Sequence, residues 1–409
     1  MKMRELVERT RVSKATIEHY RIRGLLKASR TPTGRWDYDE DSPDLLVLIH
    51  RKLTPLGINL DTIRTLLGVS SPREIEDKLT QLPAAEFRAW IDQVSDKLYL
   101  RAYNQHPGWA NWQQQVKRFK ERTGIFIPFD TKNSGQTLTA LVAEKANPVA
   151  DASYFGVTFG IEAARRGVAE GYVPPTGGSL PPELRDAEWR WVTVHYGTIT
   201  FTVNKKALRG HPIPRSWRDL LKPVYRGMVG FLDPASTFAG FAAMLAANLA
   251  LGGTLEDWNP GFRYLKRLLR ASPTILKQIA YARVLRGEIP IMIDYDFNAY
   301  RLKYEEGLDA EVMMPVEGSL IVPYVVSLVK GARHRANAQK WIDYLLSDEG
   351  QRLFAEGYVR PVRLDATPAD VLERFLPDSE YRRARTVNYA AMAESQQIFR
   401  DRWIETVRP

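Results

Sequence analysis

Among the first residues, apolar positions recur at the spacing typical of short amphipathic helices. One helix is predicted over Met3–Thr10, with its apolar residues on one face. A second begins at Ser13, whose hydroxyl can accept from a backbone N–H one turn on, and it directs Ile17 and Tyr20 toward the first helix. Gly24 can end that helix. Two short helices joined by a tight turn predict a helix-turn-helix, whose second helix enters the major groove of DNA.

The following stretch predicts a wing and further helices. Lys27–Asp41 contains Pro32, Thr33 and Gly34 between short extended pieces, which suits a small hairpin. From Leu45 to Leu67 the apolar residues return at helical spacing. We therefore expect residues 1–70 to form an all-α winged helix-turn-helix that binds double-stranded DNA.

Residues 71–97 predict a helical connector. An apolar stripe runs from Phe87 to Leu98, within a helix expected over Ala84–Leu98 that is roughly 22 Å long at 1.5 Å per residue. The stripe can pack against its own chain or serve as a dimerisation helix, and the pattern leaves both open. We expect a homodimer by one route or another, because winged helices commonly bind paired half-sites.

Beyond Leu98, predicted strands alternate with predicted helices. A strand over Leu98–Tyr103 is followed by an amphipathic helix ending at Gly124, a second strand over Ile125–Asp130 and a third near Ala150. This order is typical of an α/β fold with a parallel sheet. No glycine-rich dinucleotide loop, phosphate-binding loop or nucleophile elbow follows any of these strands, so no enzyme activity is predicted.

Composition narrows the function classes. The 409 residues suggest two or three domains, and the net charge of +10 permits a polyanionic partner. The first 35 residues hold ten Lys or Arg and only three acids, so much of the positive charge coincides with the helix-turn-helix. The absence of cysteine and the wide spacing of the six histidines predict no metal site and no cofactor. The charged start and the short apolar stretches predict a cytoplasmic chain without membrane insertion.

Two small turns ahead of helices are candidates for binding an anion. Ser134 and Gly135 follow the second strand, and Ser236 and Thr237 precede the long apolar helix that starts at Phe238. Helix N-termini present unpaired N–H groups and partial positive charge. Plain helix capping is the alternative use of these hydroxyls, and it stays open.

A second group of candidates combines carboxylates and aromatic rings. Asp294 and Asp296 share one face at the end of a predicted strand, where they can take an ammonium or sugar hydroxyls, and Tyr295 lies on the other face. Asp296 can instead cap the following helix. Trp109, Tyr154 and Tyr295 can stack on an organic ligand, although aromatic side chains more often belong to the core.

The N-terminal segments VSKATIEHYRIRGLL, GRWDYDED and LGINLDTIRTLL resemble the MerR family of regulators in order and spacing. The chain departs from the family pattern at Glu18, where a basic residue is usual, and at His19-Tyr20, where two tyrosines are usual. It also departs at Gly34-Arg35-Trp36, where Gly-Tyr-Arg is usual. The resemblance implies base contacts from one set of side chains and phosphate contacts from another. The first set is Ser13, Lys14, Thr16 and His19, and the second is Arg21, Arg23, Lys27 and Arg35.

Residues 98 to about 363 resemble the type 2 periplasmic solute-binding proteins of ABC importers. The resemblance is carried by WQQQVKRFKERTGI, EKANPVADASYFG, PRSWRDLLKPVYRGMVGFLDPASTFAG and WIDYLLSDEGQRLFAEGYVRPVR. It implies two α/β lobes that close on a solute and are joined by strands near Trp191–Val203 and Val312–Leu328. The domain should span 98–376, with lobe 1 at about 98–195 and 320–376, lobe 2 at about 203–312, and a helical tail over 377–409. Tyr295 and Tyr300 do not match the vicinal tyrosine pair of iron binders, so iron is not expected.

Together these features predict a multidomain protein, a winged helix-turn-helix followed by a two-lobed α/β solute-binding fold. Its expected function is that of a cytoplasmic one-component transcription regulator that senses a zwitterion, sugar phosphate, phosphonate or amine. The alternative is a non-exported transport accessory whose N-terminal module docks a protein. The sequence leaves the ligand, the operator and the direction of regulation open.

Overall fold

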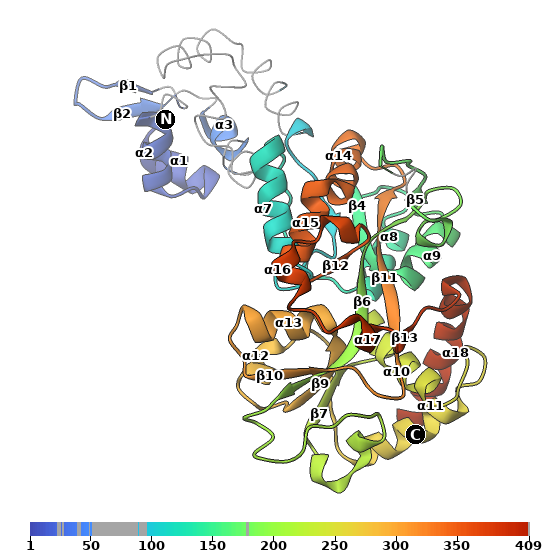
Figure 1. The fold of residues 1–409 in the computed structure, drawn as a ribbon. Coiled ribbons are helices and arrows are strands. Elements are labelled where there is room, and N and C mark those ends of the chain that lie inside the picture. The colour runs from blue at the N-terminus through green and yellow to red at the C-terminus, as the bar shows by residue number, and fades with distance from the viewer. Residues whose placement is uncertain are drawn as a thin grey trace. The chain divides into compact units, whose positions relative to one another are not determined.

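A computed structural model of the chain describes residues 1–22, 26, 28–38, 42–48, 50, 89, 96–176 and 180–407 (Figure 1). The described residues belong to two compact units, one formed by the N-terminal hundred residues with 122–127, the other by the rest. Most of the expected connector at 71–97 and of the helical stretch Leu45–Leu67 lies outside the described residues, as do Arg23 and Lys27.

The first unit contains the predicted pair of helices and the predicted hairpin. Its elements are α1 (Met3–Thr10), α2 (Lys14–Ile22), β1 (Ala28–Arg30), β2 (Trp36–Tyr38) and α3 (Ser42–Leu48). Arg11 ends α1 in the left-handed conformation, with φ 56°, and so makes the tight turn into α2. Strands β1 and β2 are antiparallel. One small apolar core holds these elements together: Leu6, Val12, Ile17, Leu26, Tyr38 and Leu46.

The second unit is organised around one mixed sheet with two long antiparallel strands in its middle. The strand order is β3 (Ala102–Tyr103), β4 (Ala152–Gly156), β11 (Ser319–Val329), β6 (Val192–Asn204), β9 (Ile291–Tyr295), β7 (Val229–Leu232) and β8 (Thr274–Leu276). The first half of β6 pairs with β11, and the second half pairs with β9. Each half of β6 therefore belongs to a different lobe, as the solute-binding resemblance implies, and β6 is called the hinge strand below.

Short strands extend the sheet of each lobe. They are β5 (Ala169–Glu170), β12 (Arg360–Pro361) and β13 (Ala384–Arg385) beside β6 and β11 in lobe 1 and the hinge, and β10 (Ala310–Met313) beside β6 in lobe 2. The single strand predicted over Val312–Leu328 is wrong in extent, because β10 and β11 are separate. Pro315 has no N–H to donate and Gly318 adopts φ 114°, so the chain turns between them.

Helices cover the sheet of both lobes. Lobe 1 carries α7 (Trp112–Thr123), α8 (Ser134–Ala143), α9 (Val157–Arg165), α14 (Arg335–Leu346) and α15 (Asp348–Glu356); lobe 2 carries α10 (Phe238–Ala250), α11 (Asn259–Arg270), α12 (Tyr281–Leu285) and α13 (Asp296–Tyr304). Helix α10 is buried over Phe238–Asn248, which explains why it is apolar on all sides. Among the described helices, none has the length and apolar character needed to cross a membrane.

The predicted strands at the start of the second unit are shorter than expected. Only Ala102–Tyr103 forms a strand within the predicted Leu98–Tyr103. Within the predicted Ile125–Asp130, Phe126 and Asp130 each make one isolated β-bridge.

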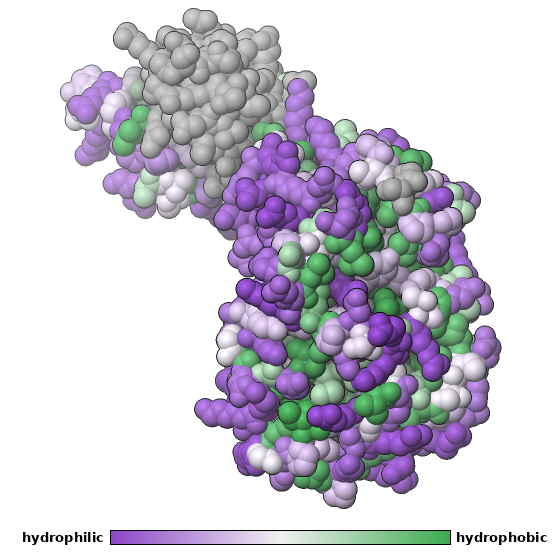
Figure 2. Space-filling view, in the orientation of Figure 1, coloured by the Kyte–Doolittle hydropathy of each residue, from purple (hydrophilic) through white to green (hydrophobic). Residues whose placement is uncertain are grey.

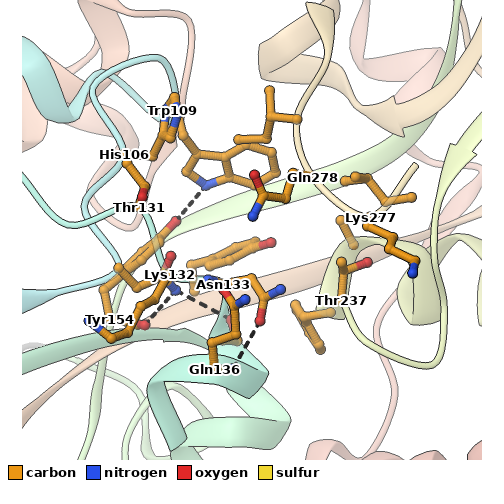
Figure 3. A pocket seen from close by; sticks show the side chains of 17 residues that line it. His106, Trp109, Thr131, Lys132, Asn133, Gln136, Tyr154, Thr237, Lys277 and Gln278 are labelled. Carbon is orange, nitrogen blue, oxygen red and sulfur yellow. Dashed lines mark hydrogen bonds between the residues drawn. The ribbon is translucent and has the colours of Figure 1, made fainter. Parts of the chain in front are cut away.

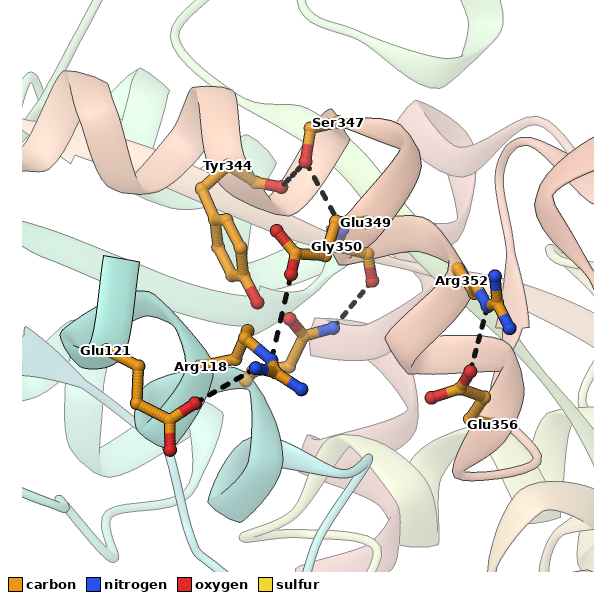
Figure 4. A network of polar contacts seen from close by, with 9 residues as sticks. Arg118, Glu121, Tyr344, Ser347, Glu349, Gly350, Arg352 and Glu356 are labelled. Carbon is orange, nitrogen blue, oxygen red and sulfur yellow. Dashed lines mark hydrogen bonds and ion pairs between the residues drawn. The ribbon is translucent and has the colours of Figure 1, made fainter. Parts of the chain in front are cut away.

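A network of polar contacts joins helices of lobe 1 (Figure 4). In it, Gln115 Nε2 of α7 donates to Gly350 O of α15 at 2.8 Å, and Arg118 lies 3.7 Å from Glu349.

The C-terminal residues form α16 (Ala369–Leu372), α17 (Asp378–Tyr381) and α18 (Tyr389–Val407). Helix α18 contacts both lobes. Thr158 of lobe 1 hydrogen-bonds Gln396, while Trp258 Nε1 of lobe 2 donates to Ser395 Oγ at 2.7 Å. Figure 2 shows that hydrophilic side chains cover much of the visible face of these lobes, with smaller apolar areas between them.

Candidate functional site

A cavity of about 230 Å³ lies between the two lobes (Figure 3). Drug-sized ligands occupy pockets of ≈ 300–1,000 Å³, so this cavity suits a smaller solute. Lobe 1 lines it with side chains from the β3–α7 loop, the turn before α8, β4 and β11. Lobe 2 lines it with the start of α10 and the turn after β8. The polar members are Asn104, His106, Thr131, Lys132, Asn133, Ser134, Gln136, Thr237, Lys277 and Gln278.

The N-terminus of α8 forms one side of the cavity. Asn133 Oδ1 accepts from Gln136 N at 2.9 Å, and Gln136 Oε1 accepts from Asn133 N at 3.0 Å. This reciprocal capping box fixes the helix start with the side chains at the cavity edge. Ser134 Oγ accepts from Gly156 N at 3.1 Å, which ties the helix to the end of β4. The serine hydroxyl therefore has a structural use as well as a place in the lining.

The N-terminus of α10 forms the opposite side. Thr237 Oγ1 accepts from Gly240 N at 3.0 Å and donates to Asp233 O at 2.8 Å. Lys277 and Gln278 follow β8, which runs parallel to β7, so the ends of both strands meet beside this helix. Two helix N-termini, one from each lobe, thus border the same small cavity, and each carries partial positive charge.

Two lysines add full charges to the cavity. Lys132 Nζ lies 2.7 Å from Asp130 Oδ2 and 4.0 Å from the centre of the Tyr103 ring. Lys277 is exposed, and within the described part of the chain no ion pair engages it. Lys277 is therefore the lysine whose charge is more available to a bound anion.

An aromatic wall with a directed chain of hydrogen bonds closes the back of the cavity. Trp109 Nε1 donates to Tyr154 OH at 3.1 Å, and Tyr154 OH lies 2.7 Å from His195 Nε2. Burial lowers the pKa of His195 to about 3, so its ring is neutral. Because His195 Nδ1 faces the carbonyl of Tyr196 at 3.2 Å, Nδ1 carries the proton and Nε2 accepts from Tyr154. Trp109, Tyr154 and His195 therefore donate in one direction, toward the hinge strand.

The predicted carboxylates lie outside the cavity lining. Asp294 is buried, and its Oδ2 accepts from Tyr281 OH at 2.8 Å and from Asn298 Nδ2 at 3.1 Å. Burial raises its pKa to about 6. Asp296 accepts from Thr198 N at 3.0 Å and from Tyr381 OH at 2.7 Å. Asp296 therefore fastens the hinge strand and the C-terminal segment to the start of α13.

Four of the nine predicted ligand residues line the cavity: Trp109, Ser134, Tyr154 and Thr237. Gly135 and Ser236 line an adjoining groove instead, and Tyr295 is buried with Asp294 and Asp296. The sequence reasoning missed Asn133 and Gln136, although their N-x-x-Q spacing is a capping-box signal. It also missed Lys277 and Gln278, whose position at the end of a short parallel strand was the available signal.

The two lobes touch beside the cavity, at a residue that lines it. Phe238, the first residue of α10, packs directly on the backbone of Gly156 at the end of β4, where a Cβ atom would stand 1.7 Å from the phenylalanine Cδ1. The Phe238 ring also meets the Tyr324 ring edge-on at 5.5 Å between centroids. The absence of a side chain at Gly156 is therefore what permits this degree of closure.

In the first unit, the predicted DNA contacts fall into different surroundings. Ser13 Oγ accepts from Thr16 N at 3.1 Å and so starts α2. Lys14 and His19 are exposed on α2, and Arg35 is exposed in the hairpin turn. Arg21 instead makes an ion pair with Glu18 at 2.5 Å.

Across both units, the residues that the structure describes contain no group of three or more side chains suited to a metal ion.

Two family models match the chain in succession. Residues 1–68 match the MerR HTH family regulatory protein, and residues 147–391 match the bacterial extracellular solute-binding protein. Both resemblances drawn from the sequence are thereby confirmed.

Known proteins resemble the second part of the chain. A periplasmic protein of Salmonella typhimurium, named provisionally for 2-aminoethylphosphonate binding, is 28% identical over 274 residues, which cover 65% of this chain and 78% of that protein. An uncharacterized protein of Haemophilus influenzae is 29% identical over 309 residues, covering 72% and 86%. The first relative is named as a binding protein and the second is uncharacterized, and neither carries the name of an enzyme.

Solved structures show the same fold. The periplasmic binding protein AfuA of Actinobacillus pleuropneumoniae, with fructose-6-phosphate bound, has a TM-score of 0.63 at 23% identity, covering 76% of this chain and 98% of that one. Iron-bound HitA of Pseudomonas aeruginosa has a TM-score of 0.60 at 24% identity, covering 75% and 99%. At these identities the likeness supports the two-lobed fold and not a particular ligand.

Proposed function

Because this chain belongs to the bacterial extracellular solute-binding protein family and begins with a MerR-type helix-turn-helix, we propose that it is a DNA-binding regulator controlled by a small solute. One observation carries the proposal: the chain contains both a helix-turn-helix segment and a two-lobed solute-binding fold with a cavity between its lobes. A regulator of this kind works where DNA is, so we assign it to the cytoplasm, and we expect it to bind paired half-sites as a homodimer.

We infer that the ligand carries a phosphonate or phosphate group. The starts of α8 and α10 border the cavity from opposite lobes, and Lys277 brings a charge that no described acid neutralises. Helix N-termini and a lysine together suit a tetrahedral anion. The name of the Salmonella relative gives 2-aminoethylphosphonate, a small solute compatible with a cavity of about 230 Å³. It is the first compound to test.

Ligand binding would act on DNA by favouring the closed lobes. A ligand shifts such an equilibrium only by its difference in affinity for the two states, and moving it from 1:99 to 99:1 takes about 5.5 kcal/mol. An anion bridging the two helix starts contacts both lobes only when they are closed, which supplies such a difference. The DNA-binding segments of the dimer would then change in spacing or orientation.

Two binding experiments on the full chain test the proposal. In a thermal-shift assay with 2-aminoethylphosphonate, fructose 6-phosphate and spermidine, a ligand at a hundredfold excess over Kd adds about 2.7 kcal/mol of stability. We expect a phosphonate or phosphate ester to raise the melting temperature and spermidine to leave it unchanged. Fluorescence anisotropy with DNA from upstream of the gene should then show binding that weakens with salt and changes when the ligand is added.

Failure of the two experiments has separate meanings. Ligand binding without DNA binding would favour a transport accessory whose N-terminal segment docks a protein, a reading that the periplasmic binding-protein relatives also suit. DNA binding that no anionic solute alters would contradict the sensing role of the cavity.

A further inference from the structure

Two of the positions at which the helix-turn-helix departs from the MerR pattern, Glu18 and Trp36, are joined through one arginine. Arg21 Nη2 donates to Glu18 Oε1 at 2.5 Å and its Nε donates to Oε2 at 3.1 Å, a two-point contact. The same guanidinium lies 4.0 Å from the centre of the Trp36 ring, and Arg30 lies 5.0 Å from that ring. The acid on α2 is thus held in a fixed position by a side chain stacked on the hairpin.

Glu18 is the member of this pair that faces outward. Its side chain is 36% exposed, against 17% for Arg21. The hydrogen bond from Arg21 lowers the pKa of Glu18, so the carboxylate stays charged at neutral pH. Each carboxylate oxygen has a second lone pair, so the outward side can still accept a hydrogen bond from a partner.

The neighbouring surface of α2 also suits direct contact with base edges. Ala15, His19 and Ile22 are exposed on the same side of the helix, and Ile22 is 68% exposed. Apolar side chains in the major groove contact the methyl group of thymine. A carboxylate in the major groove is repelled by the phosphates, so it favours binding only where a base donates a hydrogen bond to it. The base donor from which Glu and Asp side chains accept is the N4 amino group of cytosine.

We propose that Glu18 is a specificity-determining residue that reads a cytosine in the major groove, and that Arg21 and Trp36 hold it in place for that contact. The proposal rests on the DNA binding proposed above and deepens it. It predicts that this acid lowers binding to DNA in general and raises discrimination at one base pair of each half-site.

The test is in-vitro selection from a library of randomised duplex DNA, with full-length wild type, Glu18→Gln and Glu8→Gln. Glu8 is the matched control, since it is an exposed acid on α1 that also pairs with an arginine, Arg4 at 3.0 Å. Both changes remove one negative charge, so both should strengthen binding to random DNA. Only Glu18→Gln should abolish a preference for cytosine of about tenfold at one position, because a glutamine amide suits adenine instead.

Three outcomes decide the matter. Loss of the preference in Glu18→Gln, with retention in wild type and Glu8→Gln, supports the proposal. A cytosine preference that survives in Glu18→Gln overturns it while leaving the DNA-binding function intact. No enriched sequence with any of the three proteins overturns the DNA-binding function, and this proposal with it. Arg21→Lys, which cannot make the two-point contact, should weaken the preference severalfold without removing it.

Discussion

Replacing Gly156 by alanine should weaken solute binding without unfolding the protein. Gly156 has φ −64° and ψ 144°, a conformation open to alanine, so the substitution adds no backbone strain. The added methyl group would meet the Phe238 ring of the other lobe, with Cβ to ring-carbon distances of 1.7, 2.1 and 2.2 Å. The three atoms nearest to the added methyl group all belong to Phe238, so the steric conflict arises where the lobes touch.

The size of the effect follows from that overlap. Carbon atoms settle at about 3.5–4.0 Å, so the ring and the alanine must separate by roughly 2 Å. Overpacking of this kind costs about 1–3 kcal/mol. If the ligand-free lobes are open, the whole cost falls on the closed, ligand-bound state. At about 1.4 kcal/mol for each factor of ten, Kd should rise about 5- to 150-fold.

Calorimetric titration with 2-aminoethylphosphonate and fructose 6-phosphate measures that change, and melting of the ligand-free proteins provides the control. Gly135→Ala is a graded comparison, because its Cβ would stand 3.3 Å from Ser236 O and should cost far less. Adding Phe238→Leu to Gly156→Ala should restore part of the affinity. Unchanged affinity in Gly156→Ala would refute the reasoning, and so would a fall of several degrees in the melting temperature of the ligand-free variant, since the lobes would then touch without ligand.

Further substitutions test the remaining features. Lys277→Gln should weaken binding of a phosphonate about three- to tenfold, and Lys132→Gln less, because Asp130 already pairs with Lys132; equal losses by titration would contradict this ranking. Ser134→Ala should destabilise the fold by about 1–3 kcal/mol in chemical denaturation, because the buried N–H of Gly156 loses its acceptor. Burial raises the pKa of Asp294 to about 6, above its unfolded value of ~3.9. Between these two pH values the folded protein holds a proton that the unfolded chain has released. The ionised carboxylate therefore lowers the stability of the fold at high pH, and this stability is regained as the pH falls from 6 to 4. Asp294→Asn should therefore be about 3 kcal/mol more stable than wild type at pH 8 and show little gain at pH 4; a constant difference across that range would exclude the titration.

Local signals in the sequence were sufficient for much of the fold. Ser13 starts α2, the turn residues around Gly34 make the hairpin, and the apolar run after Thr237 is a buried helix. Each of these features depends on neighbours within one or two turns of the chain. The break between β10 and β11 was also local, since Pro315 and Gly318 mark it, but the apolar residues on both sides concealed it.

The missing parts of the site depend on distant contacts. Lys277 reaches the cavity because β8 pairs with β7, more than forty residues earlier in the chain, and no local pattern specifies that pairing. Alternation predicts that Asp294 and Asp296 share a face of one strand end, but this expectation is wrong, because β9 ends at Tyr295 and Asp296 is the first residue of α13. Here packing against α12, α13 and the C-terminal segment encloses both carboxylates.

The one-way hydrogen-bond chain behind the cavity has a consequence for how this protein can change its solute. The protons of Trp109 and Tyr154 are already committed toward His195 and the hinge, so the aromatic wall presents ring surface to a ligand and little that selects charge. Selection therefore belongs to the short turns around Lys132 and Lys277, which can mutate without disturbing the buried rings. The solute preference of such a receptor can therefore change through substitutions in a few loop residues, while the buried rings that hydrogen-bond toward the hinge strand stay the same.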